Sequence, residues 1–446
     1  MRKSHKKQLP LCQPTPDHPK AKEMTEISKI LDQNCSIYDQ VLQDISNGSS
    51  NRGAQGMTAE QVVRAAIVKQ MMGCSYEELE FLLEDSLTFR FFCRFEFQDS
   101  FKKSTLNQNI KAISPESWEA INKCLIKFAE AEAIEQGRKV RIDCTVVESN
   151  IHAPYDSELL WDGVRVLTRL LDTARFEYGI DFEYMNHSRA AKRRNLEITN
   201  ARNKKARTKK YKGLIKLAEN TVHYARGAFS VLESRHSLSL EQEILKNELL
   251  HFIPLIEKVI DQTVRRVINN EKVAASDKIF SIFEEHTDII IKDRRDTYYG
   301  HKICLSGGAS NLILDCQILT GNPADSTLTK EMLERQKDIY GRAPLKVALD
   351  GGFASKKNLE DAKELGIKDV CFSKGRGMDI EDMCRSEYVY KCLRRFRAGI
   401  ESGISWLKRA FGLTRCMWRG LESFKSYVWA SIVSANLQTL ARHRLS

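Results

Sequence analysis

The sequence lacks the long apolar runs and paired cysteines that mark several classes of protein. No run approaches the roughly 20 apolar residues that span a bilayer. The opening stretch MRKSHKKQLPLCQPTPDHPK has no apolar centre of a secretion signal. The 12 cysteines are scattered singly, without the C-x-x-C pair of a zinc or redox site. We therefore expect a cytoplasmic protein whose cysteines are mostly small buried side chains.

Length and composition indicate a globular chain of more than one domain. Its 446 residues exceed what one compact core normally holds, so about two or three domains are expected. The hydrophobic content of 42% and the charged content of 29% are typical of a soluble protein.

Positive charge is concentrated in one segment of the chain. The net charge is +11, from 70 Lys and Arg against 59 Asp and Glu. Residues 189–212, RAAKRRNLEITNARNKKARTKKYK, hold eleven of these cations and the single acid Glu197, a local balance of 11 − 1 = +10. Like charge at this density needs an anionic partner, and a nucleic-acid backbone is the usual one. The alternative is a solvated basic loop. The expected DNA contacts are Arg193, Arg194, Lys204, Lys205, Arg207, Lys209 and Lys210.

The first third of the chain reads as helical. Residues 1–56 hold the helical stretch TEISKILDQNCSIYDQVLQDI and then the link SNGSSNRGAQG, whose Gly, Ser and Asn content predicts flexibility. Three signals for helix starts follow, at Thr58 with Gln61, at Ser75 with Glu78, and at Ser114 with Pro115. They predict a helical domain that binds DNA or mediates assembly.

Beyond residue 136 the pattern is that of a mixed sheet interrupted by helices. The run GRKVRIDCTVVESNIH is rich in β-branched residues and reads as a strand, and short β-rich runs begin at Lys278. Without the helical block between them, the order of elements is β, β, β, α, β, α, β, α. The predicted fold class is therefore α/β (α+β), with the first strand central, a large helical insertion after it, and an all-α N-terminal domain.

This pattern divides the chain into segments with separate expected roles. They are a helix and linker (1–56), the helical N-terminal domain (57–135), a catalytic domain in two pieces (136–155 and 277–430), a basic helical insertion (156–276) and a C-terminal helical tail (431–446).

Three carboxylates occupy positions where an acid costs stability. Asp143 lies inside the first strand, and Asp350 stands between the apolar run VAL and the glycines of GGF, where α/β sheets place their chemistry. Glu401 shares with Arg397 and Lys408 a stripe beside the apolar face of the helix RRFRAGIESGISWLKRAFGL. Taken singly, Asp350 could cap the following helix, and Arg397 with Glu401 could be an ordinary surface pair.

Together, the three acids predict a metal-dependent site. They come from a first strand, a later strand and a late helix, as in a ribonuclease-H-like fold. Oxygen ligands without His or Cys suit Mg²⁺. Two such ions about 3.5–4 Å apart activate a water or a 3′-hydroxyl and stabilise the leaving oxygen of a phosphoryl displacement. A dication would also offset the cost of desolvating Asp143.

The motifs around these acids resemble those of the DDE-type transposases of bacterial insertion sequences. The likeness begins at about residue 55 and runs to the C-terminus. It is carried by MTAEQVVRAAIVKQMMGCSYEELEFLLEDSLTFRFFCRF, RIDCTVVESNIH, VALDGGFASKKNLEDAKELG and RFRAGIESGISWLKRAFGLTRCMWRG. Arg397, Glu401 and Lys408 fit the last three members of the family's Tyr-Arg-Glu-Lys signature, whose tyrosine position is Arg394 here.

The resemblance implies roles for these residues. Asp143, Asp350 and Glu401 would form a catalytic triad that binds two Mg²⁺ ions, with Mn²⁺ as a substitute, and Arg397 and Lys408 would contact DNA. The implied activity is cleavage of double-stranded DNA at terminal inverted repeats and joining of the 3′-hydroxyl ends to target DNA. It would be carried out by a homodimer or larger assembly at the nucleoid.

Three alternatives remain open from the sequence. A nuclease of the same fold would cut without joining strands, and a DNA-binding derivative would keep the basic segment without catalysis. A two-carboxylate glycosidase is more distant, because it explains neither the basic segment nor the third acid.

Overall fold

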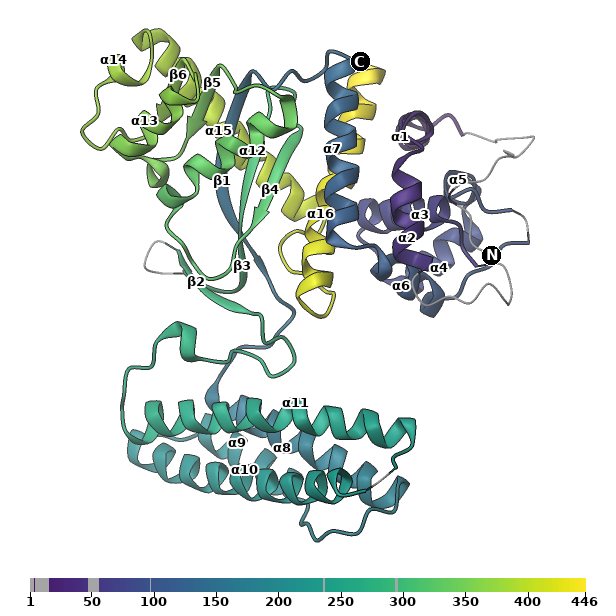
Figure 1. Cartoon of the computed structure of the whole chain (residues 1–446), viewed down its shortest axis with the longest axis vertical. Helices are drawn as coiled ribbons and strands as arrows, with labels where there is room; N and C mark the ends of the chain where they lie inside the picture. The colour runs from purple at the N-terminus through teal and green to yellow at the C-terminus, as the bar shows by residue number, and fades with distance from the viewer. Residues whose placement is uncertain (1–3, 5–15, 47–55, 97, 236, 293–295) are drawn as a thin grey trace. The chain divides into compact units, whose positions relative to one another are not determined.

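The chain forms two compact units, as a computed structural model shows (Figure 1). The structure describes residues 4, 16–46, 56–96, 98–235, 237–292 and 296–446. The first unit consists of Met1–Ser149 and Gly300–Ser446, and Asn150–Tyr299 forms the second. The second unit is therefore an insertion into the first. Residues 47–55, most of the predicted flexible link, lie outside the described residues.

The first unit is built on a mixed sheet with β1 at its centre. The sheet order is β2-β3-β1-β5-β6, and β4 pairs with β3. β1 runs antiparallel to β3 and parallel to β5, and β5 runs parallel to β6. The strands are β1 (Lys139–Glu148), β2 (Asp288–Lys292), β3 (Asp296–Gly307), β4 (Ile313–Ile318), β5 (Lys346–Leu349) and β6 (Asp369–Phe372). The predicted ribonuclease-H-like sheet, with a central first strand, is confirmed.

Helices cover this sheet between and after its parallel strands. α12 (Thr329–Tyr340) connects β4 to β5, and α13 (Lys356–Glu364) connects β5 to β6. The short α14 (Ile380–Met383) follows β6 and leads into α15 (Glu387–Ala410). α15 packs on β1, β5 and β6. β5 and β6 consist mainly of buried apolar residues, as expected for parallel strands covered on both faces.

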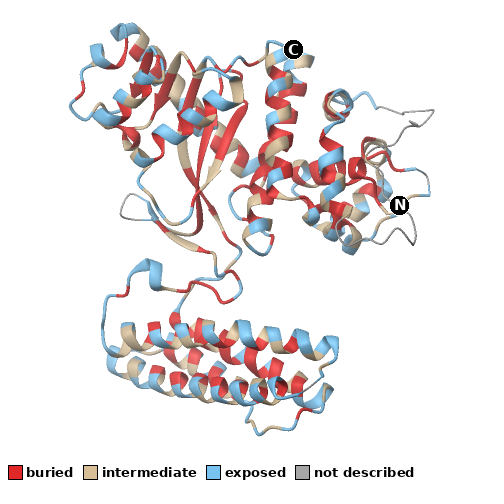
Figure 2. Cartoon of the chain, in the orientation of Figure 1, coloured by how far each residue is buried: buried red, intermediate tan, exposed pale blue. Residues whose placement is uncertain are grey.

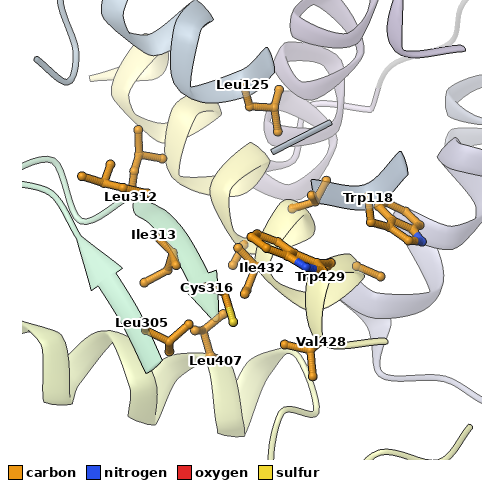
Figure 3. Packing of buried hydrophobic residues seen from close by; sticks show 14 of the residues in the cluster. Trp118, Leu125, Leu305, Leu312, Ile313, Cys316, Leu407, Val428, Trp429 and Ile432 are labelled. Atoms are coloured by element: carbon orange, nitrogen blue, oxygen red, sulfur yellow. The ribbon is translucent and has the colours of Figure 1, made fainter. Parts of the chain in front are cut away.

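One long helix, α16 (Leu421–Leu445), joins the N-terminal helices to the sheet. It is buried along most of its length (Figure 2) and contacts α1, α3, α7 and β4. Figure 3 shows Trp118 of α7 near Trp429 of α16, and Ile313 of β4 on the sheet side of Ile432. Residues 431–446, which the sequence predicts as a C-terminal helical tail, are helical and form the second half of this core helix.

The N-terminal helices begin where their capping residues predict. Thr58 and Ser75 each form a complete capping box, and Ser114 caps a helix that starts with Pro115. The helices are α1 (Pro19–Gln33), α2 (Ile37–Ser46), α3 (Ala59–Met72), α4 (Tyr76–Asp85), α5 (Leu87–Phe92), α6 (Lys103–Ala112) and α7 (Pro115–Ala131). They share one continuous apolar core with the sheet, so packing does not separate residues 57–135 from the rest of the first unit. As functional divisions, the predicted segments stay predictions.

The second unit is a bundle of four helices with a core of its own. These helices are α8 (Asp156–Asp172), α9 (Ser188–Thr199), α10 (Lys204–Glu233) and α11 (Leu240–Thr263). Leu160, Leu214 and Leu249 are fully buried between them, whereas their outer faces are exposed (Figure 2). The predicted helical insertion is thus observed. Among the described residues, no helix combines the length and hydropathy of a bilayer-spanning segment.

The β-rich run predicted from Lys278 begins later than expected, at Asp288. Ile279 is drawn into the helical bundle, where it is buried. The side-chain amide of Gln262 donates to the carbonyl oxygen of Ile279 and accepts from its N–H, at 3.2 and 2.8 Å. Because these bonds occupy both backbone groups, no strand partner is available to Ile279.

A histidine–aspartate pair in the second unit makes its stability depend on pH. Nε2 of His152 lies 2.7 Å from Oδ2 of Asp162, whose side chain is buried. The hydrogen bond to Asp162 raises the pKa of His152 from 6.5 to about 9. Because the folded-state pKa is the higher one, the pair stabilises fully below about pH 6.5 and loses its contribution as the pH rises through about 9.

We predict that the His152→Gln variant lacks this pH dependence. The melting temperature of the wild-type protein, measured by circular dichroism, should approach that of the variant between about pH 6.5 and 9. His223→Gln, at an exposed position of α10, is the matched control and should follow the wild type. A constant difference between wild type and His152→Gln across this range would contradict the prediction.

Candidate active site

Asp143 and Asp350 lie next to each other on paired strands. In the parallel pairing of β1 with β5, Ile142 is opposite Leu349; Asp143 is the next residue of β1, and Asp350 directly follows β5. Asp350 keeps an extended backbone, with φ −73° and ψ 165°. Side chains at equivalent positions of paired strands point to the same face of a sheet. The two carboxylates, far apart in the sequence, are therefore neighbours.

Both carboxylates are on the face that α15 covers. Arg141, two residues before Asp143, donates through Nη1 to the carbonyl oxygen of Phe396 on α15 at 3.2 Å. Because side chains alternate along a strand, Asp143 points to the same face as Arg141. Asp350 Oδ1 lies 3.4 Å from Nη1 of Arg397, which is also on α15.

Asp350 is oriented by a serine that directly follows the neighbouring strand. The hydroxyl of Ser373, the residue after β6, donates to Asp350 Oδ1 at 2.8 Å. Burial acts to raise the pKa of Asp350, but hydrogen bonds from Ser373 and Gly351 and the charge of Arg397 outweigh it and lower this pKa. The next helix, α13, is capped by Ser355. Capping is therefore not the role of Asp350, and its carboxylate is ionised and fixed.

Glu401 is linked to Asp350 through a shared cation. Nη1 of Arg397 is 2.8 Å from Oε1 of Glu401 and 3.4 Å from Oδ1 of Asp350. The Arg397 side chain is only 17% exposed, whereas that of Glu401 is 58% exposed. An ordinary exposed pair at i and i+4 contributes little, because water screens both charges. Here the largely buried guanidinium group of Arg397 joins α15 to the sheet through Asp350. Arg397 and Glu401 are therefore not an ordinary surface ion pair.

Asp143 and Lys408 complete the predicted set. Asp143 is half-buried in β1, and one of its carboxyl oxygens accepts the N–H of Cys144 at 2.8 Å. Lys408 is half-buried on α15, two helical turns beyond Glu401. Since that spacing returns to the same side of a helix, Arg397, Glu401 and Lys408 lie along one stripe, as predicted.

The donors fit a divalent cation in chemistry, but they are not gathered around one point. Among the described residues, no three acidic, His or Cys side chains are close enough to hold an ion together. Asp143 and Asp350 are adjacent, whereas Glu401 is engaged by Arg397. The guanidinium group is thus the countercharge of both Asp350 and Glu401. To join an all-oxygen site of the kind that Mg²⁺ prefers, Glu401 would have to turn away from it.

The predicted DNA-contact segment lies in the second unit, on α9 and the first turns of α10. Glu197 accepts from Arg194 at 2.7 Å and from Lys210 at 2.8 Å, and lies 3.7 Å from Nε of Arg193. Lys204 donates to the side chain of Asn270 at 2.7 Å.

The remaining charge of this segment faces solvent. Lys205, Arg207 and Lys209 are exposed and form no ion pair with any residue that the structure describes. Glu197 is one acid shared by three cations, so most of the excess positive charge of the segment is not compensated. The surface of α9 and α10 therefore fits a polyanion better than a self-contained network of ion pairs.

Two residues of the site were missed by the sequence analysis. Ser373 follows the apolar run DVCF as Asp350 follows VAL, and the alignment of parallel strand ends could have identified it. Arg141 shares the strand and the face of Asp143, so strand alternation could have placed it beside the site. The contact of Arg141 with Phe396 of α15 could not be read from the sequence, because it depends on how the helix crosses the sheet.

Two family models match the chain. Residues 286–437 match the transposase DDE domain, and residues 13–112 match a transposase domain, DUF772. The first match includes Asp350 and Glu401, and Asp143 precedes it because of the inserted unit. No curated protein and no solved structure matches the chain.

The mixed sheet and the two matches define a DNA transposase with a ribonuclease-H-like fold. Within that class, the two matches support a DDE-type transposase of an insertion element. The resemblance seen in the sequence is thus confirmed at the level of the family.

We predict that Ser373→Ala weakens binding of Mn²⁺, used as a probe for the divalent site. Loss of the hydroxyl leaves the Asp350 carboxylate less firmly oriented, and such outer contacts typically change metal affinity by about 10- to 100-fold. Calorimetric titration of the DNA-free protein measures the effect. Ser402→Ala, at an exposed serine of α15, should retain wild-type affinity. Equal affinities for Ser373→Ala and wild type would contradict the orienting role.

Proposed function

We propose that this transposase binds the inverted-repeat ends of its element, cleaves the DNA, and joins the 3′-hydroxyl ends to target DNA. Asp143, Asp350 and Glu401 are the catalytic carboxylates of this reaction. The observation that carries the proposal is the placement of Asp143 beside Asp350, with Glu401 tied to Asp350 through Arg397. All three acids face a single helix–sheet junction.

The carboxylates are the ligands of two Mg²⁺ ions, for which Mn²⁺ substitutes. When bound, such a pair of ions activates a water or 3′-hydroxyl and stabilises the leaving oxygen of the displacement. Ser373 holds Asp350 in its ligating orientation. Arg397 neutralises Asp350 and Glu401 in the absence of ions, and its guanidinium group becomes available to a DNA phosphate once Glu401 turns away. Lys408, on the same stripe, adds a second phosphate contact.

The second unit supplies sequence-independent attraction to DNA. Its exposed cations on α9 and α10 release counterions from the phosphate backbone as they bind. A homodimer or larger assembly at the nucleoid would pair two element ends. Two rival functions share this geometry, namely a nuclease that does not join strands and a DNA-binding derivative without catalysis. They differ from the proposed function in their products.

The decisive experiment is a cleavage and joining assay on DNA that carries the element's own ends. We expect Mg²⁺-dependent cleaved and joined products from the wild-type protein, none in EDTA, and none from Asp350→Asn. DNA binding by this variant, measured by gel shift, should persist, because Asp350 belongs to the first unit whereas the basic segment belongs to the second.

The products separate the rivals. Cleaved ends without joined products would favour the nuclease. Binding without cleavage under any divalent ion would favour the inactive derivative.

A second prediction concerns the basic segment. Replacing Lys205, Arg207 and Lys209 with Gln should lower DNA affinity and reduce the slope of log K against log salt by about 2 to 3. Fluorescence anisotropy at several salt concentrations measures both quantities.

The matched control replaces three cations on other parts of the second unit, Lys246, Lys258 and Lys272. This variant loses the same charge and should keep the wild-type slope. Equal slope changes in the two variants would show that net charge, and not this surface, attracts DNA.

A further inference from the structure

Arg141 is a buried cation on the strand of Asp143, and the buried carboxylate of Glu135 attracts its charge without forming an ion pair with it. Arg141 is 6% exposed, and it forms no ion pair within the described part of the chain. Nη2 donates to Oδ1 of Asn311 at 2.7 Å, and Nη1 donates to the carbonyl oxygen of Phe396 at 3.2 Å. Its guanidinium carbon lies 4.7 Å from the centre of the Phe396 ring. Burying a charge in this way is costly, so stability alone does not explain it.

Two glycines make room for this side chain between the sheet and α15. A Cβ atom at Gly399 would lie 1.8 Å from Nη1 of Arg141, closer than any real contact. Across the strand pair, Gly307 is opposite Arg141, and a Cβ there would lie 2.9 Å from Ile400 and 3.4 Å from Nε of Arg141. The guanidinium group therefore sets how closely α15 approaches β1 and β3.

These contacts connect the two parts of the candidate site. On β1, Arg141 is two residues before Asp143. Its guanidinium group also touches Gly399 of α15, which is two residues before Glu401. Its Nη1 donates to the carbonyl oxygen of Phe396, about one turn before Gly399. Arg141 therefore lies where it can influence the distance between the first and the third carboxylate, although it is itself not a ligand.

We propose that Arg141 is a positioning residue, which holds α15 at the distance from β1 that lets Glu401 complete the divalent-ion site with Asp143 and Asp350. This inference rests on the proposed function, because it concerns the geometry of the same ligands. Displacements of about 1 Å in such sites cost about 10²-fold in rate. The side chain acts through the backbone of α15 and contacts neither DNA nor ion.

The test compares variants that alter this contact in opposite ways. Arg141→Met removes the guanidinium group and leaves a chain of similar length. Gly399→Ala keeps Arg141, but the added Cβ atom displaces the guanidinium group. The same substitution raises the helix propensity of α15. Arg94→Met is the matched control, since Arg94 is a similarly buried arginine among the N-terminal helices. Mn²⁺ affinity of the DNA-free protein is measured by calorimetry, DNA cleavage at saturating DNA by gel assay, and folding by thermal melting.

We expect Arg141→Met and Gly399→Ala each to weaken Mn²⁺ binding by about tenfold or more and to slow cleavage by about 10²-fold. In the Arg141→Met background, Gly399→Ala should add no further loss, because the clash is gone. Arg94→Met should lower the melting temperature without changing Mn²⁺ affinity.

The outcomes separate this inference from the proposed function. If wild-type protein binds Mn²⁺ and cleaves, but Arg141→Met and Gly399→Ala retain wild-type Mn²⁺ affinity, the positioning role is wrong and the proposed function stands. If Arg141→Met does not fold, the affinity of Gly399→Ala decides alone. Failure of wild-type protein to bind Mn²⁺ or cleave overturns both.

Discussion

The parallel pairing of β1 with β5 is the constraint on which the rest of the site depends. β1 accepts an antiparallel partner on one side and a parallel partner on the other, so its middle lies opposite the end of β5. This register places an acid from the interior of one strand beside an acid at the terminus of another. A shift of one residue would turn Asp143 to the opposite face, away from α15. The register of β1 therefore determines the geometry of the candidate site and the packing of the core together.

The inserted unit is compatible with this geometry because it carries its own core. Asn150–Tyr299 interrupts the chain between β1 and most of β3, yet the two strands still pair over eight residues, Arg141–Glu148 with Gly300–Gly307. Buried leucines and isoleucines hold the bundle together, and the like charges lie on its outside. Its stability does not rely on the basic face, which is free to serve an electrostatic role.

Local signals in the sequence predicted the elements well, and tertiary packing accounts for what was missed. Capping boxes at Thr58 and Ser75, strand alternation and the three acids are short-range patterns whose physics is contained in a few neighbouring residues. The role of α16 was not visible, because a helix buried on nearly all sides shows no polar face to distinguish it from a tail. The strand predicted from Lys278 starts only at Asp288 for a similar reason. The backbone N–H and carbonyl of Ile279 bond to the side chain of Gln262, which is distant in the sequence.

The position of Arg397 follows from the electrostatics of a site that gathers acids. Asp350 and Glu401 would repel each other across the helix–sheet junction, and no solvent cation is as well placed as a guanidinium group on the same helix. A strong permanent pair would, however, exclude Glu401 from metal binding. The large exposure of Glu401, set against the burial of Arg397, resolves this conflict. The exposed partner can leave at low cost, because water and a dication can replace the guanidinium group, while Arg397 stays fixed beside Asp350. The cluster is therefore neutralised without ions, and in the proposed function Glu401 is the side chain that turns to bind them.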